Sequence, residues 1–308
     1  MKLQTRIENA ELPLSPVGAK RSVLFLLLKA MRPKQWTKNL VVFAGLIFSQ
    51  KAFENGNFML SLFTFFVFCL LSGSVYLIND LVDVQKDRAH PEKRKRPIAS
   101  GDLSTSAAMT GAAAAALFSL AGAFVLHREF GLIALIYFLT TLGYTFKLKN
   151  VVLMDVIVIA IGFVFRALAG VVVINVNLSP WLLMCTFLLA LFLALTKRRH
   201  ELVLLDSNAI SHRRILDEYT PAMLDQMISV ATSSTVMAYS LYTFTSGHSV
   251  YLMATIPFVI YGIFRYQYLA HSRDIGGSPE SALLKDWPMV VNILLWVSAC
   301  LVILYLFE

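Results

Sequence analysis

The residues best able to bind a metal ion lie together in one short segment. It holds an amide and three carboxylates, Asn79, Asp80, Asp83 and Asp87. On a helix, where successive residues turn by about 100°, these four side chains fall within an arc of roughly 100°. Carboxylates this close repel one another unless a cation lies between them. Oxygen ligands suit Mg²⁺, which keeps waters and substrate phosphates in its shell, so the segment predicts a Mg²⁺–diphosphate site in which Asn79 donates to a phosphate oxygen.

A basic loop follows this acidic segment and predicts a contact with phosphate. It contains a run of four cations at 93–96, and its two prolines and a glycine favour an ordered loop. The usual enrichment of Lys and Arg on the cytoplasmic side of a membrane explains part of this charge. The rest would close over a phosphate, and Arg94 is our candidate. For the acidic segment, the plain alternative is a solvated helix end with i,i+4 pairs.

Three further polar clusters supply candidates for substrate binding, because each places cations beside an apolar run. A lysine ammonium binds phosphate as a compact point charge, and an arginine can bind it through two donors. Interfacial anchoring and i,i+4 pairing are the plain alternatives. The candidates are Lys34 and Asn39 in the first cluster, Tyr144, Lys147 and Asp155 in the second, and Lys197, Arg198 and Glu201 in the third.

Two polar residues fall inside apolar runs and therefore need partners within the protein. Arg166 lies deep in its run, where a charge must face protein or water rather than lipid. We expect Arg166 to brace neighbouring helices through a carboxylate, with substrate binding as the alternative. We expect Asn39 to face an internal cavity.

The elements that must position these residues are predicted to be membrane-spanning helices. The chain has 308 residues, 57% of them hydrophobic and 15% charged, and its mean hydropathy is +0.66. These values exclude an ordinary soluble domain. Apolar runs long enough to cross a hydrocarbon core of about 30 Å predict an all-α polytopic membrane protein with about nine transmembrane helices. The predicted spans are 38–51, 58–80, 104–126, 130–146, 151–174, 180–196, 222–246, 250–270 and 287–306.

The first of these spans is short, and a second interpretation of it is open. A helix that begins at Val23 and bends at Arg32 and Pro33 would lengthen it, because proline interrupts helical hydrogen bonding. Residues 1–22 are polar and lack the layout of a signal peptide. We expect them to form a cytoplasmic tail, followed by one catalytic domain at 23–308.

Lys and Arg are distributed unequally among the tails and loops, which predicts the orientation of the chain. The N-terminal tail and the loops at 81–103, 147–150, 197–221 and 271–286 carry nearly all of those outside the spans. We therefore expect the N terminus and the acidic segment in the cytoplasm and the C terminus outside. The net charge of +8 then reflects this bias and attraction to anionic lipid, and we expect no nucleic-acid partner.

The cysteines predict neither a disulfide nor a zinc site. Cys69, Cys185 and Cys300 all fall in apolar runs, where buried thiols are the ordinary interpretation. The sequence leaves the oligomeric state open, with a homo-oligomer among the options.

The acidic pattern resembles that of the UbiA superfamily of membrane prenyltransferases. The shared features are Asn-Asp-x-x-Asp-x-x-x-Asp after the second span, Asn39 in the first, and a loop that ends Arg96-Pro-Ile-Ala-Ser-Gly. The resemblance covers almost the whole chain and implies nine helices around a central cavity that opens sideways to lipid. It also implies that Asp80, Asp83 and Asp87 are the catalytic, Mg²⁺-binding residues, in a bacterial plasma membrane.

The chain departs from the commoner family pattern after its sixth span. The second acidic motif of aromatic-acceptor prenyltransferases would fall there, and the cations at 197–199 stand in its place. A second Mg²⁺ bridge is not expected at that position, and direct capture of a phosphate is favoured. The segments Arg-Pro-Lys-Gln-Trp-Thr-Lys-Asn, Asp-Arg-x-His-Pro-x-Lys-Arg and Lys-Arg-Arg-His-Glu resemble one branch of the superfamily, which acts on decaprenyl phosphate.

That resemblance implies a phosphoribosyltransferase that makes a cell-wall precursor. Its donor would be phosphoribosyl diphosphate, its acceptor a polyprenyl phosphate and its by-product diphosphate. The charges fit independently, because an acceptor phosphate is already an anionic nucleophile and catalysis then needs mainly alignment and charge stabilisation. One alternative is a UbiA-type enzyme that moves a prenyl group from a prenyl diphosphate to an aromatic acceptor. Another is a transporter, whose acids would lie at mid-span and not beside a basic loop.

Overall fold

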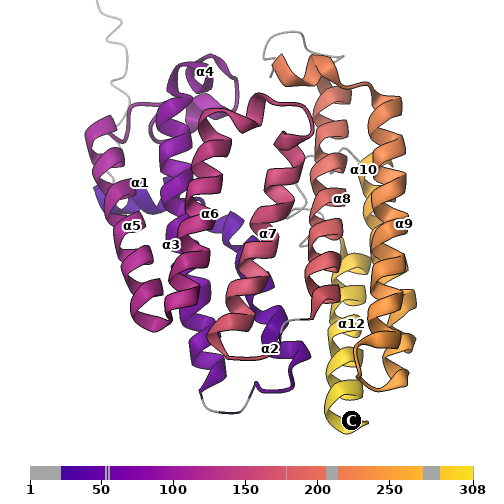
Figure 1. Ribbon diagram of the computed structural model, residues 1–308. Helices are drawn as coiled ribbons and strands as arrows, with labels where there is room; N and C mark the ends of the chain where they lie inside the picture. Colours follow the sequence, from indigo (N-terminus) through magenta and orange to yellow (C-terminus); the bar gives the residue numbers. More distant parts are fainter. Residues whose placement is uncertain are drawn as a thin grey trace, which may run out of the picture.

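The computed structural model describes residues 22–52, 54, 56–177, 179–205, 214–272 and 285–307, and the regular elements in these ranges are all helical. The long helices stand side by side with connections at both ends (Figure 1). The predicted all-α fold is confirmed. The long helices are α3 (Asn57–Val82), α5 (Thr105–Leu126), α6 (Arg128–Phe146), α7 (Met154–Val173), α8 (Pro180–Leu205), α9 (Pro221–Thr245), α10 (Ile256–Ser272) and α12 (Trp287–Leu306).

Within the described ranges, six helices are long and apolar enough to cross a membrane: α3, α5, α6, α7, α8 and α12. The predicted seventh and eighth spans are also helical, as α9 and α10. However, α10 has only 17 residues, and α9 is rich in serine and threonine. The predicted count of nine spans is therefore not confirmed.

The predicted helix over 38–51 is wrong, because residues 23–48 form three short elements and no continuous helix. They are α1 (Val23–Ala30), the 3₁₀ helix η1 (Pro33–Phe43) and α2 (Ala44–Phe48). Between α1 and η1, Arg32 has a left-handed φ of 57°. The next residue, Pro33, lacks an N–H and disfavours helical backbone at the residue before it. The structure confirms the alternative interpretation, in which the helical segment begins at Val23 and is interrupted at Arg32 and Pro33.

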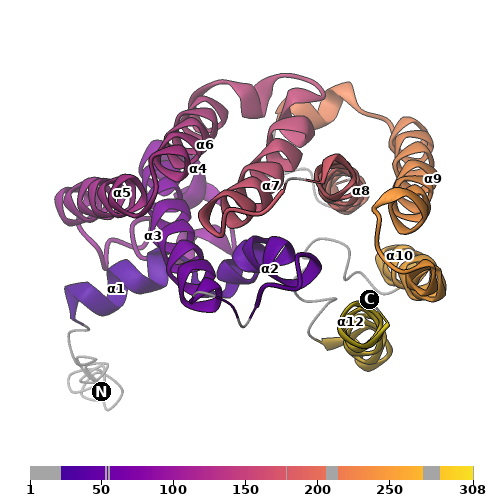
Figure 2. The same cartoon turned by 60° about the horizontal axis from the view of Figure 1, so that its bottom comes forward.

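Helices that follow one another in the sequence pack against one another in space. The contacts run from α3 and α5 through α6, α7, α8, α9 and α10 to α12, and Figure 2 shows this succession along the bundle. Both η1 and α2 pack on α7. This approach requires glycine at position 170, because a Cβ on Gly170 would lie 2.0 Å from the carbonyl oxygen of Val42.

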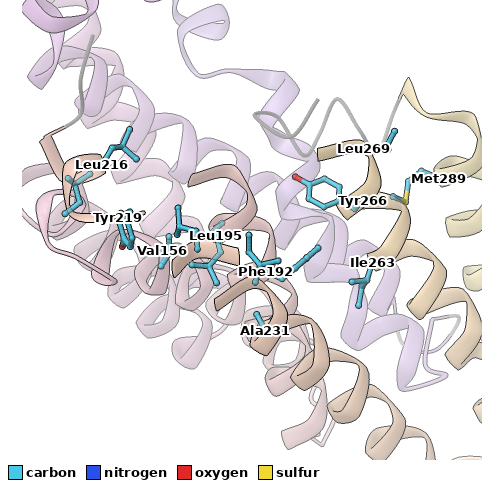
Figure 3. Packing of buried hydrophobic residues seen from close by; sticks show 14 residues of the cluster. Val156, Phe192, Leu195, Leu216, Tyr219, Ala231, Ile263, Tyr266, Leu269 and Met289 are labelled. Atoms are coloured by element: carbon cyan, nitrogen blue, oxygen red, sulfur yellow. The ribbon is translucent and has the colours of Figure 1, made fainter. Parts of the chain in front are cut away.

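The largest cluster of buried hydrophobic side chains joins the second half of the chain into one unit. It links α7 to α8, α9, α10, α12 and the 3₁₀ helix η4 (Arg214–Glu218). Figure 3 shows Tyr219, Leu216 and Val156 at one end of this cluster. Lipid tails are as apolar as these side chains, so close packing rather than water exclusion holds such helices together.

Arg166 braces the first half of the chain through neutral groups. Its side chain, 6% exposed, donates to Oδ1 of Asn39 (2.7 Å), the hydroxyl of Tyr137 (2.7 Å) and the carbonyl of Gly162 (2.8 Å). These three acceptors are neutral oxygens, so the expected brace exists but it does not run through the expected carboxylate. Asn39 is buried in this network and does not line the cavity described below, because Arg166 holds its amide oxygen.

Replacing Arg166 by alanine is expected to lower the thermal stability of the protein substantially. The change leaves Asn39 and Tyr137 without their charged donor, and each buried group left unpaired costs about 1–3 kcal/mol. Arg166→Lys should recover only part of the loss, since an ammonium cannot reproduce a planar fork of donors. Unfolding in detergent measures this, with the exposed Arg128→Ala as the matched control. Equal melting temperatures for the Arg166 and Arg128 variants would show that the network is not stabilising.

Candidate active site

The acidic segment forms one wall across the junction of two helices. Asp83 lies between the end of α3 and the start of α4 (Val84–Ala89). Two backbone hydrogen bonds hold this turn: the N–H of Asp83 donates to the carbonyl of Asn79, and the N–H of Asp87 donates to the carbonyl of Asp83. Asp80 and Asp87 are buried, at 2% and 3% exposure. We call Asp80, Asp83 and Asp87 the acidic wall. Helical spacing predicts that the three carboxylates share one face, and in the structure Arg96 joins two of them, Asp80 and Asp87.

Two arginines from different parts of the chain reach the buried carboxylates of the wall. Arg32, at the break before η1, pairs with Oδ1 of Asp80. Arg96 donates to the same oxygen of Asp80 at 3.1 Å and to Oδ2 of Asp87 at 2.6 Å. These pairs offset the repulsion between neighbouring carboxylates and fasten the first short helix and the basic loop to α3.

The third carboxylate of the wall is paired with a buried lysine. Lys149, in the 3₁₀ helix η3 (Leu148–Asn150), is 6% exposed. It donates to Oδ2 of Asp83 at 2.6 Å and lies 3.4 Å from Oδ1 of Asn79. Three carboxylates are therefore matched by three cations, each from a different part of the chain.

The acidic wall has the donor chemistry of a Mg²⁺ site. Its oxygen ligands fit the preference of Mg²⁺ for a few carboxylates plus phosphate and water. Within the part of the chain that the structure describes, no three His, Cys, Asp or Glu side chains converge closely enough to hold an ion by themselves. The reason is visible in the pairs above, because each carboxylate is turned toward a cation. The residues fit a metal that arrives with an anion able to take those cations.

The loop that carries Arg96 is held by a neutral histidine. Nδ1 of His90 accepts hydrogen bonds from the backbone N–H groups of Glu92 (3.2 Å) and Lys93 (3.4 Å). Burial and the nearby charges of Lys93 and Arg96 lower the pKa of His90. The ring is therefore neutral near pH 7 and able to accept, which keeps the turn before Arg96 in place.

A second polar cluster, centred on Arg198, lies at the ends of α6, α7 and α8 that the sequence predicts to face the cytoplasm. The arginine, 3% exposed, donates to Oδ2 of Asp155 at 2.6 Å and pairs with Glu201. Another of its nitrogens lies 3.5 Å from the hydroxyl of Tyr144. The structure thus brings four predicted substrate-binding residues together, and it adds Tyr219, which donates to Oδ1 of Asp155 at 2.7 Å.

An apolar cavity of about 660 Å³ opens beside this second cluster. Its wall is formed by η1, α2, α7, α8, α9, α10 and α12. The charged side chains among its lining residues are all cationic: Lys38, Lys197 and Arg198. Phe48, Tyr239, Tyr242 and Trp296 form an aromatic part of the same wall. Such a lining fits a molecule with a long apolar chain and an anionic head.

Three predicted cations lie at exposed positions, and neighbours two residues away make the contacts with the acidic wall. Lys34, Arg94 and Lys147 are exposed, whereas Arg32, Arg96 and Lys149 pair with carboxylates. The cause is local backbone geometry. Each pair lies in or beside a break or a 3₁₀ turn, where the periodicity of an α-helix no longer indicates direction. The sequence does not indicate that Tyr219 belongs to the site, because this residue lies in a short polar segment far along the chain from every other member of the site.

The sequence is similar to a known protein family and to proteins of named activity. The model of the UbiA prenyltransferase family matches residues 39–289. Decaprenyl-phosphate phosphoribosyltransferase of Corynebacterium glutamicum is 35% identical over 290 residues, covering 91% of this chain and 87% of that protein. The protein of the same name from Mycolicibacterium smegmatis is 33% identical over 297 residues, covering 91% and 93%.

Solved structures share the same fold. A UbiA homologue from Archaeoglobus fulgidus bound to DMAPP and Mg²⁺ superposes with a TM-score of 0.70. The two sequences are 20% identical, and the match covers 91% of this chain and 99% of that chain. At this identity the likeness concerns the fold alone.

Proposed function

The chain belongs to the UbiA prenyltransferase family, and from this premise we propose that it transfers 5-phosphoribose from phosphoribosyl diphosphate to a polyprenyl phosphate such as decaprenyl phosphate. It is an integral membrane transferase. Relatives named for this reaction match over most of their length. The observation that carries the choice of acceptor is the cavity, whose apolar wall and purely cationic charges fit a polyprenyl phosphate.

The donor would bind at the acidic wall. Asp80, Asp83 and Asp87 would hold Mg²⁺ through carboxylate oxygens, and Asn79 would donate to a phosphate oxygen. Mg²⁺, when bound, offsets the negative charge that develops on the departing diphosphate. Arg32, Arg96 and Lys149 would turn from the carboxylates to the phosphate oxygens, which they can reach because they already border the wall. The exposed Lys34, Arg94 and Lys147 would meet those phosphates from the solvent side.

The acceptor would lie with its chain in the apolar cavity and its phosphate near Lys38, Lys197 and Arg198. A phosphate oxygen of the acceptor forms the new bond to C1 of the ribose, and the bond from C1 to the diphosphate breaks. The nucleophile is already an anion, so the chain needs no strong general base. Its work is to align two anions that repel each other, and cations on both sides of the site supply that alignment.

Purified protein should form a phosphoribosylated lipid when it receives phosphoribosyl diphosphate, Mg²⁺ and a polyprenyl phosphate. Labelled donor and extraction of the lipid product measure this directly. Removing divalent ions with a chelator should stop turnover, and added Mg²⁺ should restore it. Prenylation of an aromatic acid from a prenyl diphosphate, without any phosphoribosyl transfer, would instead assign the chain to the other enzymatic class.

We further propose that the site faces the cytoplasm of a bacterial cell, with the N terminus inside and the C terminus outside. The argument is the concentration of Lys and Arg on the side of the acidic wall. A membrane-impermeant thiol reagent applied to intact cells should label Glu129→Cys, at an exposed position in the first turn of α6. It should miss Lys95→Cys, whose native side chain is 67% exposed, until the membrane is opened. The opposite pattern would refute this orientation.

A further inference from the structure

We infer that Tyr219 is a positioning residue that couples the two halves of the site, an inference that rests on the proposed function. The two halves are the acidic wall, where the donor would bind, and the Arg198 cluster beside the cavity, where the acceptor would bind. Its hydroxyl donates to Oδ1 of Asp155 at 2.7 Å and accepts from the backbone N–H of Leu153 at 2.8 Å. Both partners lie more than sixty residues away in the sequence. One phenol therefore fastens the segment after η4 to the start of α7.

The segment 149–155, to which Tyr219 is hydrogen-bonded, makes contacts in both halves of the site. At its beginning, Lys149 donates to Asp83 of the acidic wall. At its end, Asp155 accepts from Arg198, which lines the cavity. Only the short connection between η3 and α7 separates these two contacts. A displacement of this connection would therefore move the donor side and the acceptor side of the site together.

The connection between η3 and α7 contains a residue with a disfavoured backbone conformation, which contacts from elsewhere in the chain must stabilise. Leu153 has a φ of 66° and a ψ of −36°, which a residue with a bulky side chain rarely adopts. The hydroxyl of Tyr219 accepts from the N–H of this same residue. The hydrogen bond thus stabilises the one residue at which the segment would most readily relax.

The phenol is well placed to act as a fixed donor and not as an acid or base. Tyr219 is 4% exposed and packs with Leu216 and Val156 in the cluster of Figure 3. Burial and the hydrogen bond to Asp155 raise the pKa of Tyr219 to about 12, while the Leu153 N–H and Arg198 act in the opposite direction. The hydroxyl therefore keeps its proton over the working pH range.

A double-mutant cycle tests this role. Tyr219→Phe is expected to lower kcat about tenfold and to change each KM by less than about threefold, because lost alignment affects the reacting pair more than the binding of either substrate. In the Asp155→Ala background the further loss should be smaller than in the native background, since one of the two hydrogen-bond partners of Tyr219 is already gone. Tyr266→Phe is the matched control, because it removes a buried hydroxyl from the same cluster.

Four outcomes separate this inference from its alternatives. Equal kcat values for the Tyr219 and Tyr266 variants, or effects of Tyr219→Phe and Asp155→Ala that multiply independently, would overturn the positioning role while wild-type protein remains active. Wild-type protein that transfers no phosphoribose would overturn the proposed function as well. If Tyr219→Phe does not fold, a fluorinated tyrosine at 219 replaces it, because it keeps the shape and lowers the phenol pKa. Its turnover should then fall reversibly at alkaline pH where the native enzyme does not, and a pH profile identical to the native one would refute the role.

Discussion

Asp83→Asn is expected to abolish turnover while the protein still folds and inserts. The change keeps the size of the side chain and removes one charge from the acidic wall. Stabilisation of charge by a bound metal is worth several kcal/mol, and each ~1.4 kcal/mol is tenfold in rate, so the loss should be on the order of 10³-fold or more. Folding should survive, because Asp83 is at the surface side of the wall with its side chain 17% exposed, and an amide oxygen can still accept from Lys149.

The matched control is Asp102→Asn, which removes a carboxylate from an exposed loop position on the same side of the molecule. It should keep near-normal kinetics. Turnover, melting temperature and Mg²⁺ dependence are measured for both variants. Near-normal turnover of Asp83→Asn, or wild-type turnover that a chelator leaves unchanged, would remove Asp83 from the metal site.

The second large effect is expected at Arg198, and its neighbour supplies the comparison. Arg198→Ala leaves Asp155 and Glu201 without the cation that both contact. Breaking a buried ion pair costs about 3–5 kcal/mol of folding stability. Loss of a charge-assisted contact with a substrate phosphate costs about 1.5–3 kcal/mol, so kcat/KM of the folded variant should fall roughly 10- to 150-fold. Arg198→Lys should recover only part, because an ammonium cannot span both carboxylates as a fork of donors does.

Arg199→Ala removes the same charge one residue later and should have a small effect. Arg199 pairs with Asp225, and this pair is far more open to solvent, at 20% and 43% side-chain exposure against 3% for Arg198. Exposed pairs contribute only about 0–1 kcal/mol. Kinetics for both substrates and the fraction of folded protein are compared in the two variants. Equal losses at the two positions would mean that net positive charge, and not the buried network, is what the reaction needs.

The acidic wall is predictable in outline, because α-helical spacing brings Asp80, Asp83 and Asp87 to one side, but the interruption of the helix at Asp83 is not predictable in this way. Its partners are not predictable in the same way. Lys147 leaves the helical conformation, with φ of −131° and ψ of −52°, and this single change decides that Lys149 is the lysine that turns inward. The sequence indicates that a lysine of this loop belongs to the site but not which one.

The first short helices show the same limit at the level of the fold. Apolar content predicts that 38–51 lies among the spans, and Pro33 predicts the break before it, but the packing of η1 against α7 at Gly170 has no local signal. That packing joins residues more than a hundred positions apart. For the same reason the amide of Asn39 turns to Arg166 and not to the cavity, which no local pattern indicates.

The balanced charges of the acidic wall have a consequence for the order in which ligands enter. Its three carboxylates and three cations already satisfy one another. The carboxylates can take up a divalent ion alone only by abandoning their cations, and the cations can take up a diphosphate alone only by abandoning their carboxylates. When both arrive, every group exchanges one partner for another, so metal and donor should each raise the affinity for the other by the same factor. Departure of a diphosphate together with its metal would let the original ion pairs form again, so that the empty site would keep no unpaired charge at the membrane surface.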